Sequence, residues 1–123
     1  MTELERPVLL YDADCRLCRF CARGVRRLDR SGALSLLSLQ DEAARPLLAA
    51  VPTPERLASL RLADPEGALV DRGDAVAAVA RLLRAPVPRF AGPLLTRCYD
   101  AVAARRARLS RLVPDGPAPR EFP

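Results

Sequence analysis

Hydrophobic positions occur in short, well-separated blocks along the first forty residues. Residues 7–11, PVLLY, form an apolar run that ends at Asp12, and residues 33–39, ALSLLSL, form a second one. Short apolar runs bounded by polar or turn residues predict buried β-strands. Between them, residues 15–30 carry apolar side chains at steps of three or four with arginines on the opposite face, which predicts an amphipathic helix. Asp14 is expected to cap that helix.

The second half of the chain predicts a hairpin and further helices. Residues 59–64, SLRLAD, alternate between apolar and polar positions and are expected to pair with residues 68–71, ALVD, across a Pro-Glu-Gly turn. Helical spacing predicts a short helix over 41–51, another over about 74–84, and a long one over about 93–112.

This order of elements predicts an α/β protein of thioredoxin-like fold. We expect a small mixed sheet of about four strands flanked by helices, with an extra C-terminal helix. The first two strands should be parallel, because a helix joins them, and the last two antiparallel. The prediction is one domain over residues 1–114. Residues 115–123 have the proline and charge content typical of a flexible tail.

Size and composition are those of a soluble globular domain. A chain of 123 residues, half of them hydrophobic, can bury a core without disulfide bonds. No apolar run approaches the length of a membrane span, and MTELERP, residues 1–7, lacks the apolar core of a secretory signal. These features favour the cytoplasm, where thiols are mostly reduced and a close cysteine pair is typical of catalysis or metal binding.

Charge and residue usage narrow the chemistry further. The formal charge is +5, and every basic residue is an arginine. The aromatic residues are three Phe and two Tyr, and they form neither an RNA-type aromatic motif nor part of a zinc-finger spacing. Nucleic acid is therefore not an expected partner. The absence of histidine excludes Cys-His pairs, Ser-His-Asp triads and histidine metal sites.

The candidate chemistry lies in DADCRLCRFC, residues 12–21. Cys15 should lie at the first turn of a helix, where the backbone N–H groups and the helix dipole favour a thiolate. Cys18, almost one turn further on, is close enough to form a disulfide with it. We expect Cys15 to be the exposed nucleophile and Cys18 the half-shielded resolving thiol. Asp12 could accept the proton of Cys18; the alternative is that it binds backbone N–H groups of its loop.

The cysteines also allow other interpretations. Cys21 and Cys98 are expected to be buried in the core, as free cysteines usually are. Four cysteines could instead hold zinc or an iron–sulfur cluster, although ligands spaced every three residues along one helix spread along its axis. The basic face of residues 93–112 could make the protein a non-enzymatic interaction module, and the cysteine pair could serve a redox sensor. No cofactor is expected for dithiol exchange.

The stretch VLLYDADCRLC resembles the DCC family of predicted thiol-disulfide oxidoreductases, whose Asp-x-x-Cys-x-x-Cys signature is here Asp12, Cys15 and Cys18. DPEGALVDRGDAVAAVARLL and CYDAVAARRARLSRL resemble its hairpin with the following helix and its C-terminal helix, so that the resemblance covers roughly residues 7–112. It implies a thioredoxin-like fold and a redox-active cysteine pair that acts on a thiol- or disulfide-containing substrate. It also implies that Gly73 and Asp74 contribute near the site.

One feature departs from thioredoxins proper. In those proteins a cis-proline directly precedes the third strand and faces the cysteine pair. In this chain Pro52 and Pro54 precede the predicted strand by several residues. Pro54 would fit that place only if the strand began earlier than its pattern predicts.

Overall fold

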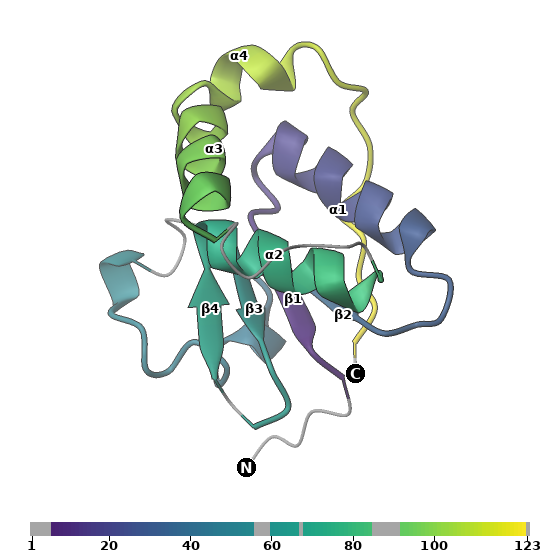
Figure 1. Cartoon of the computed structure of the whole chain (residues 1–123), viewed down its shortest axis with the longest axis vertical. Coiled ribbons are helices and arrows are strands. Elements are labelled where there is room, and N and C mark those ends of the chain that lie inside the picture. The colour runs from purple at the N-terminus through teal and green to yellow at the C-terminus, as the bar shows by residue number, and fades with distance from the viewer. Residues whose placement is uncertain (1–5, 56–59, 67, 85–91, 123) are drawn as a thin grey trace.

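The computed structural model describes residues 6–55, 60–66, 68–84 and 92–122 (Figure 1). The elements follow one another as β1 (Val8–Tyr11), α1 (Arg16–Leu28), β2 (Ser35–Ser38), the 3-10 helices η1 (Glu42–Ala44) and η2 (Thr53–Glu55), β3 (Arg61–Ala63), β4 (Leu69–Asp71), α2 (Arg72–Leu82), α3 (Gly92–Ala104) and α4 (Arg106–Ser110).

The four strands form one mixed sheet in the order β2-β1-β3-β4. β1 and β2 are parallel, with Leu9 opposite Leu36, while β3 pairs antiparallel with both β1 and β4. This confirms the predicted small mixed sheet flanked by helices, an α/β arrangement consistent with a thioredoxin-like fold. β1 and β2 can be parallel because α1 returns the chain to the end of the sheet at which β1 begins.

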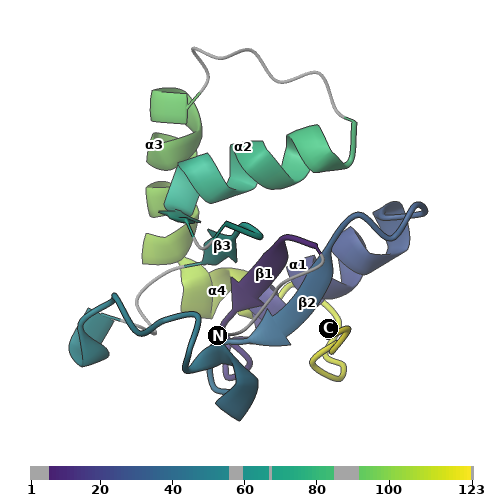
Figure 2. The same cartoon turned by 90° about the horizontal axis from the view of Figure 1, so that it is seen from below.

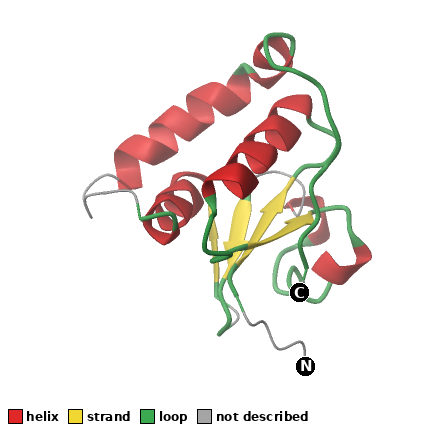
Figure 3. Ribbon diagram, turned by 90° about the vertical axis from the view of Figure 1, so that its right-hand side faces the viewer, coloured by secondary structure: helices red, strands yellow, loops and turns green. Residues whose placement is uncertain are grey.

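Alternate residues of β1 face opposite sides of the sheet and build two core clusters. Leu9 and Tyr11 are buried with residues from α1 and α2, including Ala22 and Val79. Val8 and Leu10 face the other side, where the segment that contains η1 packs against them. Figures 2 and 3 show the long helices on one side of the sheet and the short 3-10 helices on the other.

The predicted helix over 41–51 is wrong. Only Glu42–Ala44 is helical, in a 3-10 turn capped by Asp41, and turns follow through Ala50. Pro46 explains the difference, because it has no N–H with which to continue an α-helix from Glu42. The segment still fulfils a packing role, since Ala44 and Leu48 are buried.

Helix boundaries differ from the prediction at three places. Helix α1 begins at Arg16, and its N-cap is Cys15 rather than Asp14. Helix α2 begins at Arg72, two residues earlier than predicted, so that Gly73 as well as Asp74 lies in its first turn. The predicted long helix over 93–112 is divided into α3 and α4 at Arg105, whose φ of −109° and ψ of 17° are not helical. The break turns α4 over the start of α1.

Residues 115–122, the end of the chain whose composition predicts a flexible tail, lie against the folded domain. They run past α1 to the free edge of β2, where Glu121 and Leu36 exchange two backbone hydrogen bonds (Figure 1). The Tyr11 hydroxyl donates a hydrogen bond to the Pro119 carbonyl. Arg19 of α1 contacts Asp115 at 2.8 Å. Unpaired backbone groups along an edge strand are a ready acceptor for such a segment.

Candidate active site

Cys15 occupies the N-cap position of α1, with extended backbone angles, φ −100° and ψ 117°. Its sulfur accepts a hydrogen bond from the backbone N–H of Cys18 at 3.2 Å. A sulfur atom thus takes the place that a serine or aspartate oxygen usually has at a helix start. The sulfur therefore lies next to an N–H donor and to the positive end of the helix dipole.

The exposure of Cys15 is opposite to the prediction. The residue is 6% exposed, and Cys18 is the more accessible member of the pair. Helix α4, far away in the sequence, packs against α1, which begins directly after Cys15. The backbone N–H of Leu17, in the first turn of α1, donates to the Ser110 hydroxyl of α4 at 3.3 Å.

Cys18 holds its proton strongly. Burial raises the pKa of its thiol to about 12, with further contributions from a hydrogen bond to Cys15 and from the negative charge that Cys15 acquires. Arg106 of α4 acts in the opposite direction, and Asp12 in the same direction. The two cysteines therefore have different roles available to them: one sulfur at a helix N-terminus, and one neighbouring thiol that stays protonated near neutral pH.

Asp12 follows β1 and lies beside the cysteine pair. One carboxylate oxygen accepts hydrogen bonds from the backbone N–H of Asp14 at 2.9 Å and from the Gln40 side chain at 2.6 Å. The other oxygen faces Arg106 at 3.5 Å. The first contact agrees with the alternative prediction of a loop aspartate that binds backbone N–H groups. The second links the loop before α1 to α4.

Arg106 and Ser110 contact Asp12 and Leu17 beside the cysteine pair, and the sequence did not predict either contact. Both lie in α4, more than 85 residues after Cys18 in the printed sequence. The local signal is a cluster of arginines, which predicts a basic surface. No pattern within that cluster distinguishes the arginine that turns toward Asp12 from its neighbours.

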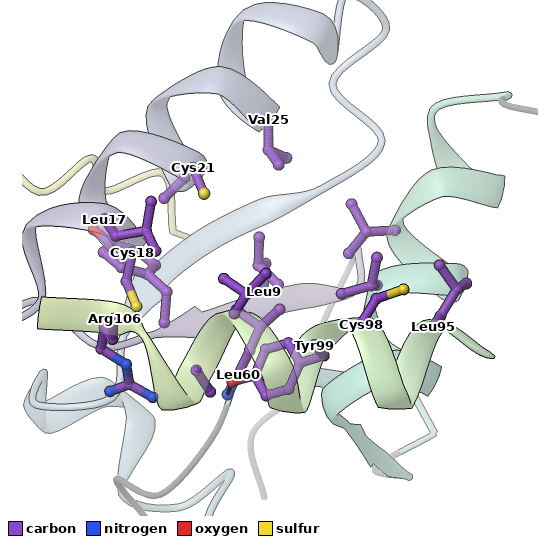
Figure 4. Close-up of a pocket in the computed structure, with 16 residues that line it drawn as sticks. Leu9, Leu17, Cys18, Cys21, Val25, Leu60, Leu95, Cys98, Tyr99 and Arg106 are labelled. Carbon is purple, nitrogen blue, oxygen red and sulfur yellow. Dashed lines mark hydrogen bonds between the residues drawn. The ribbon is translucent and has the colours of Figure 1, made fainter. Parts of the chain in front are cut away.

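A cavity of about 400 Å³ opens beside Cys18, between α1, α2, α3 and the sheet (Figure 4). Its walls are almost entirely apolar, and among them are Leu9, Val25, Leu60, Leu95 and Val102. Volumes of this size and lining are typical of small-molecule sites.

Cys21 and Cys98 also line this cavity rather than lying buried in the core. The prediction of core packing is therefore wrong for both residues. The reason is that α1 and α3 face each other across open space instead of interlocking there. Desolvation, followed by the charge of Cys15, raises the pKa of the Cys21 thiol.

Gly73 and Asp74, which the resemblance places near the site, lie in the first turn of α2. Gly73 packs directly on α3, where an added Cβ would lie 2.1 Å from the Thr96 nitrogen. Asp74 is exposed. Neither of these two described residues is part of the cavity wall.

No proline directly precedes β3. The strand begins at Arg61, later than predicted, whereas Pro54 lies in η2. Pro52 lies earlier still, and residues 56–59 are outside the described part of the chain. Leu60 holds the position directly before β3, and its N–H donates to the Tyr99 hydroxyl of α3 at 2.9 Å. Leu60 therefore stands directly before β3, where thioredoxins have a proline.

No group of three or more His, Cys, Asp or Glu residues within 6–55, 60–66, 68–84 and 92–122 is arranged to hold a metal ion. Within the same ranges, no helix has the length and apolar character needed to cross a membrane.

Comparison with known proteins identifies the family. The family model for DCC1-like thiol-disulfide oxidoreductases matches residues 9–112. A chloroplastic DCC family protein of Arabidopsis thaliana is 30% identical over 112 residues, which cover 85% of this chain and 64% of that relative. The chain thus spans less than two thirds of the relative's length. No solved structure matches it. The matched region contains Asp12, both cysteines of the pair and all of α4, and the chain belongs to the DCC1-like thiol-disulfide oxidoreductase family.

Proposed function

We propose that the protein catalyses dithiol–disulfide exchange through Cys15 and Cys18. The observation that carries this proposal is the hydrogen bond from the Cys18 N–H to the Cys15 sulfur at the start of α1. It sets the Cys15 sulfur against a backbone donor at the helix start, while the pKa of Cys18, about 12, keeps the second thiol protonated. Membership of the family supports a redox role.

In the reduced protein, the Cys15 thiolate attacks one sulfur of a substrate disulfide. The substrate S–S bond breaks, a Cys15–substrate disulfide forms, and the departing thiolate takes up a proton. Cys18 then loses its proton and attacks the Cys15 sulfur, which releases the second substrate thiol and leaves a Cys15–Cys18 disulfide. The protein loses two electrons and the Cys18 proton, and the substrate gains two electrons and two protons, the second of which comes from solvent. The reverse sequence oxidises a dithiol.

Asp12 is proposed to receive the Cys18 proton in the second step. Its carboxylate is held in place by Asp14 and Gln40, and its charge acts on the Cys18 thiol. Arg106 faces the same carboxylate and would offset the negative charge that develops on the Cys18 sulfur. These residues would serve exchange in a reducing compartment such as the cytoplasm.

The test is a redox titration with each cysteine scored separately. The purified protein is equilibrated in a series of glutathione buffers, free thiols are alkylated, and the peptides are analysed by mass spectrometry. We expect Cys15 and Cys18 to be oxidised together, as one disulfide, within the range of roughly −200 to −300 mV that cytosolic dithiol proteins occupy. A Cys98→Ser variant should titrate identically. A pair that never forms the disulfide contradicts the proposal.

A further inference from the structure

The side chain of Arg19 connects the loop before the cysteine pair to the C-terminal end of the chain. Arg19 lies in the first turn of α1. Its Nη1 donates a hydrogen bond to the Ala13 carbonyl at 2.6 Å, in the loop that leads from β1 to Cys15. Its Nη2 contacts the Asp115 carboxylate at 2.8 Å, and its Nε donates to the Gly116 carbonyl at 3.1 Å. All three guanidinium nitrogens are therefore bound, one to the loop and two to the C-terminal end.

The loop that ends at Cys15 is held on two sides. The Ala13 N–H donates to the Gln40 side chain at 2.9 Å, while the Ala13 carbonyl accepts the hydrogen bond from Arg19. The backbone N–H of Arg19 also donates to the Cys15 carbonyl at 2.9 Å. Hydrogen bonds from a guanidinium are stronger than those between neutral groups. Arg19 thus binds the residues on both sides of Asp14, where the chain enters α1.

The C-terminal segment, residues 114–121, runs along the arginine face of α1 (Figure 1). Arg23 donates to two proline carbonyls of this segment at 3.0 and 3.1 Å, and Arg26 contacts Glu121 at 2.7 Å. Among the described residues, Arg23 and Arg26 make their side-chain hydrogen bonds and ion pairs with this segment, whereas Arg19 also binds the loop. The Arg19 side chain is 19% exposed, so its contacts are less screened by solvent than those of Arg26, which is 54% exposed.

We propose that Arg19 is a positioning residue for the cysteine pair, and that Asp115 and Gly116 of the C-terminal segment hold its side chain in place for this role. This inference rests on the proposed function. A disulfide within one chain forms more favourably when its two sulfurs are held close together, since less freedom is lost on bond formation. Arg19 fixes the loop that carries Cys15, and so keeps the Cys15 sulfur beside Cys18. Arg19 contacts no reacting atom in this role.

The experiment measures the equilibrium constant for formation of the Cys15–Cys18 disulfide in glutathione buffers, with full-length protein. Glutathione disulfide is the two-electron oxidant, and the exchange follows the two steps described above in the direction that oxidises the protein. A substitution that destabilises the reduced and the oxidised protein equally leaves this constant unchanged. The constant therefore reports the positioning of the two sulfurs separately from the stability of the fold, which urea denaturation measures in parallel.

Arg19→Gln and Arg23→Gln form a matched pair, because both remove a guanidinium that binds the same segment from the same face of α1. We expect Arg19→Gln to lower the equilibrium constant about tenfold, the effect of one charge-assisted hydrogen bond. This corresponds to a rise of about 30 mV in the reduction potential of the pair. Arg23→Gln should lower the free energy of unfolding and leave the equilibrium constant unchanged.

A second pair of variants tests the C-terminal segment itself. Asp115→Lys and Glu121→Lys make the same change of charge on the same segment, but the first places a cation against Arg19 and the second against Arg26. Asp115→Lys should lower the equilibrium constant severalfold, and Glu121→Lys should leave it unchanged. In an Arg19→Gln background Asp115→Lys should have no further effect, because the segment acts through Arg19.

The outcomes separate this inference from the proposed function. If the wild type forms the disulfide and Arg19→Gln leaves its equilibrium constant unchanged, or if Arg23→Gln shifts it equally, Arg19 is not a positioning residue and the exchange function stands. If Asp115→Lys acts no differently from Glu121→Lys, or adds fully to Arg19→Gln, the segment does not act through Arg19. If the wild-type pair never forms the disulfide, the proposed function fails and this inference fails with it.

Discussion

The sulfur of Cys15 lies 3.2 Å from the backbone nitrogen of Cys18 and accepts its hydrogen bond. This contact makes Cys15 both the cap of α1 and the cysteine that is best placed to carry a negative charge. It also gives Cys18 an environment in which its own ionisation is opposed by burial and by the charge of its neighbour. The asymmetry between the two thiols leads to the first predictions.

Trapping experiments should distinguish the two cysteines. A Cys18→Ser variant should accumulate a mixed disulfide through Cys15, because the first attack proceeds and the resolving thiol is missing. A Cys15→Ser variant should accumulate none, because Cys18 stays protonated near neutral pH. Non-reducing mass spectrometry after incubation with hydroxyethyl disulfide measures both, and Cys98→Ser provides the matched control. Equal trapping by the two variants would remove the assignment of roles.

The reactivity of Cys18 should depend steeply on pH. A thiol with a pKa of about 12 is protonated throughout the physiological range, so its alkylation rate in the reduced wild type should still be rising at pH values well above neutral. In Cys15→Ala the hydrogen bond and the charge of Cys15 are gone, so the pKa of Cys18 should fall toward its ordinary value. Alkylation of the Cys18 peptide by iodoacetamide across a pH series gives both curves. Identical midpoints in the two proteins would contradict this account.

Asp12→Asn should slow the second step and leave the first. The amide retains the shape and can still accept the Asp14 N–H, but it cannot take up a proton from Cys18. The mixed disulfide should therefore persist several times longer than in the wild type near neutral pH, and the difference should shrink as rising pH supplies hydroxide as an alternative base. Stopped-flow mixing with quenching at successive times measures the intermediate. A pH profile unchanged by the substitution would restrict Asp12 to its structural contacts.

Two glycines should respond in opposite directions to alanine. At Gly73 the new Cβ would lie 2.1 Å from the Thr96 nitrogen, so Gly73→Ala must push α2 and α3 apart and should lower the free energy of unfolding by about 1–3 kcal/mol or more. At Gly24, on α1, nothing lies within 4 Å of the added atom, so Gly24→Ala should raise the free energy of unfolding by about 0.5–1 kcal/mol through helix propensity. Urea denaturation followed by circular dichroism compares the two. Equal effects would show that α2 and α3 are not in close contact.

The Tyr11 hydroxyl should stabilise the protein only when the C-terminal segment is present. Tyr11→Phe leaves the Pro119 carbonyl without its donor and should lower the free energy of unfolding by about 1 kcal/mol. In a chain that ends at Val113 the same substitution should have no cost, because the acceptor is gone. The two differences, measured by urea denaturation, form a double-mutant cycle. A cost that is the same in both chains would mean that Tyr11 stabilises the fold through other contacts.

Much of the framework could be predicted from local pattern. The apolar runs around Leu9 and Leu36 specify β1 and β2, and the amphipathic repeat between them specifies α1. The turn signal after Asp64 specifies the hairpin of β3 and β4. The helix over 41–51 could not be predicted correctly, because the spacing of its apolar residues is helical while Pro46 removes the hydrogen bond that a helix needs. The conformation of that segment instead follows the burial of the Leu48 side chain.

The sequence by itself determined which residues are proposed to carry the chemistry: an aspartate at the end of a strand and two cysteines at the start of a helix. The tertiary structure alone decided how those residues are presented. Helix α4 packs against α1, Arg106 meets Asp12 because α3 ends at Ala104 and α4 begins at Arg106, and Cys21 and Cys98 line a cavity between α1 and α3. Local propensity acts over a few residues along the chain, whereas exposure and charge pairing depend on elements that meet only after folding.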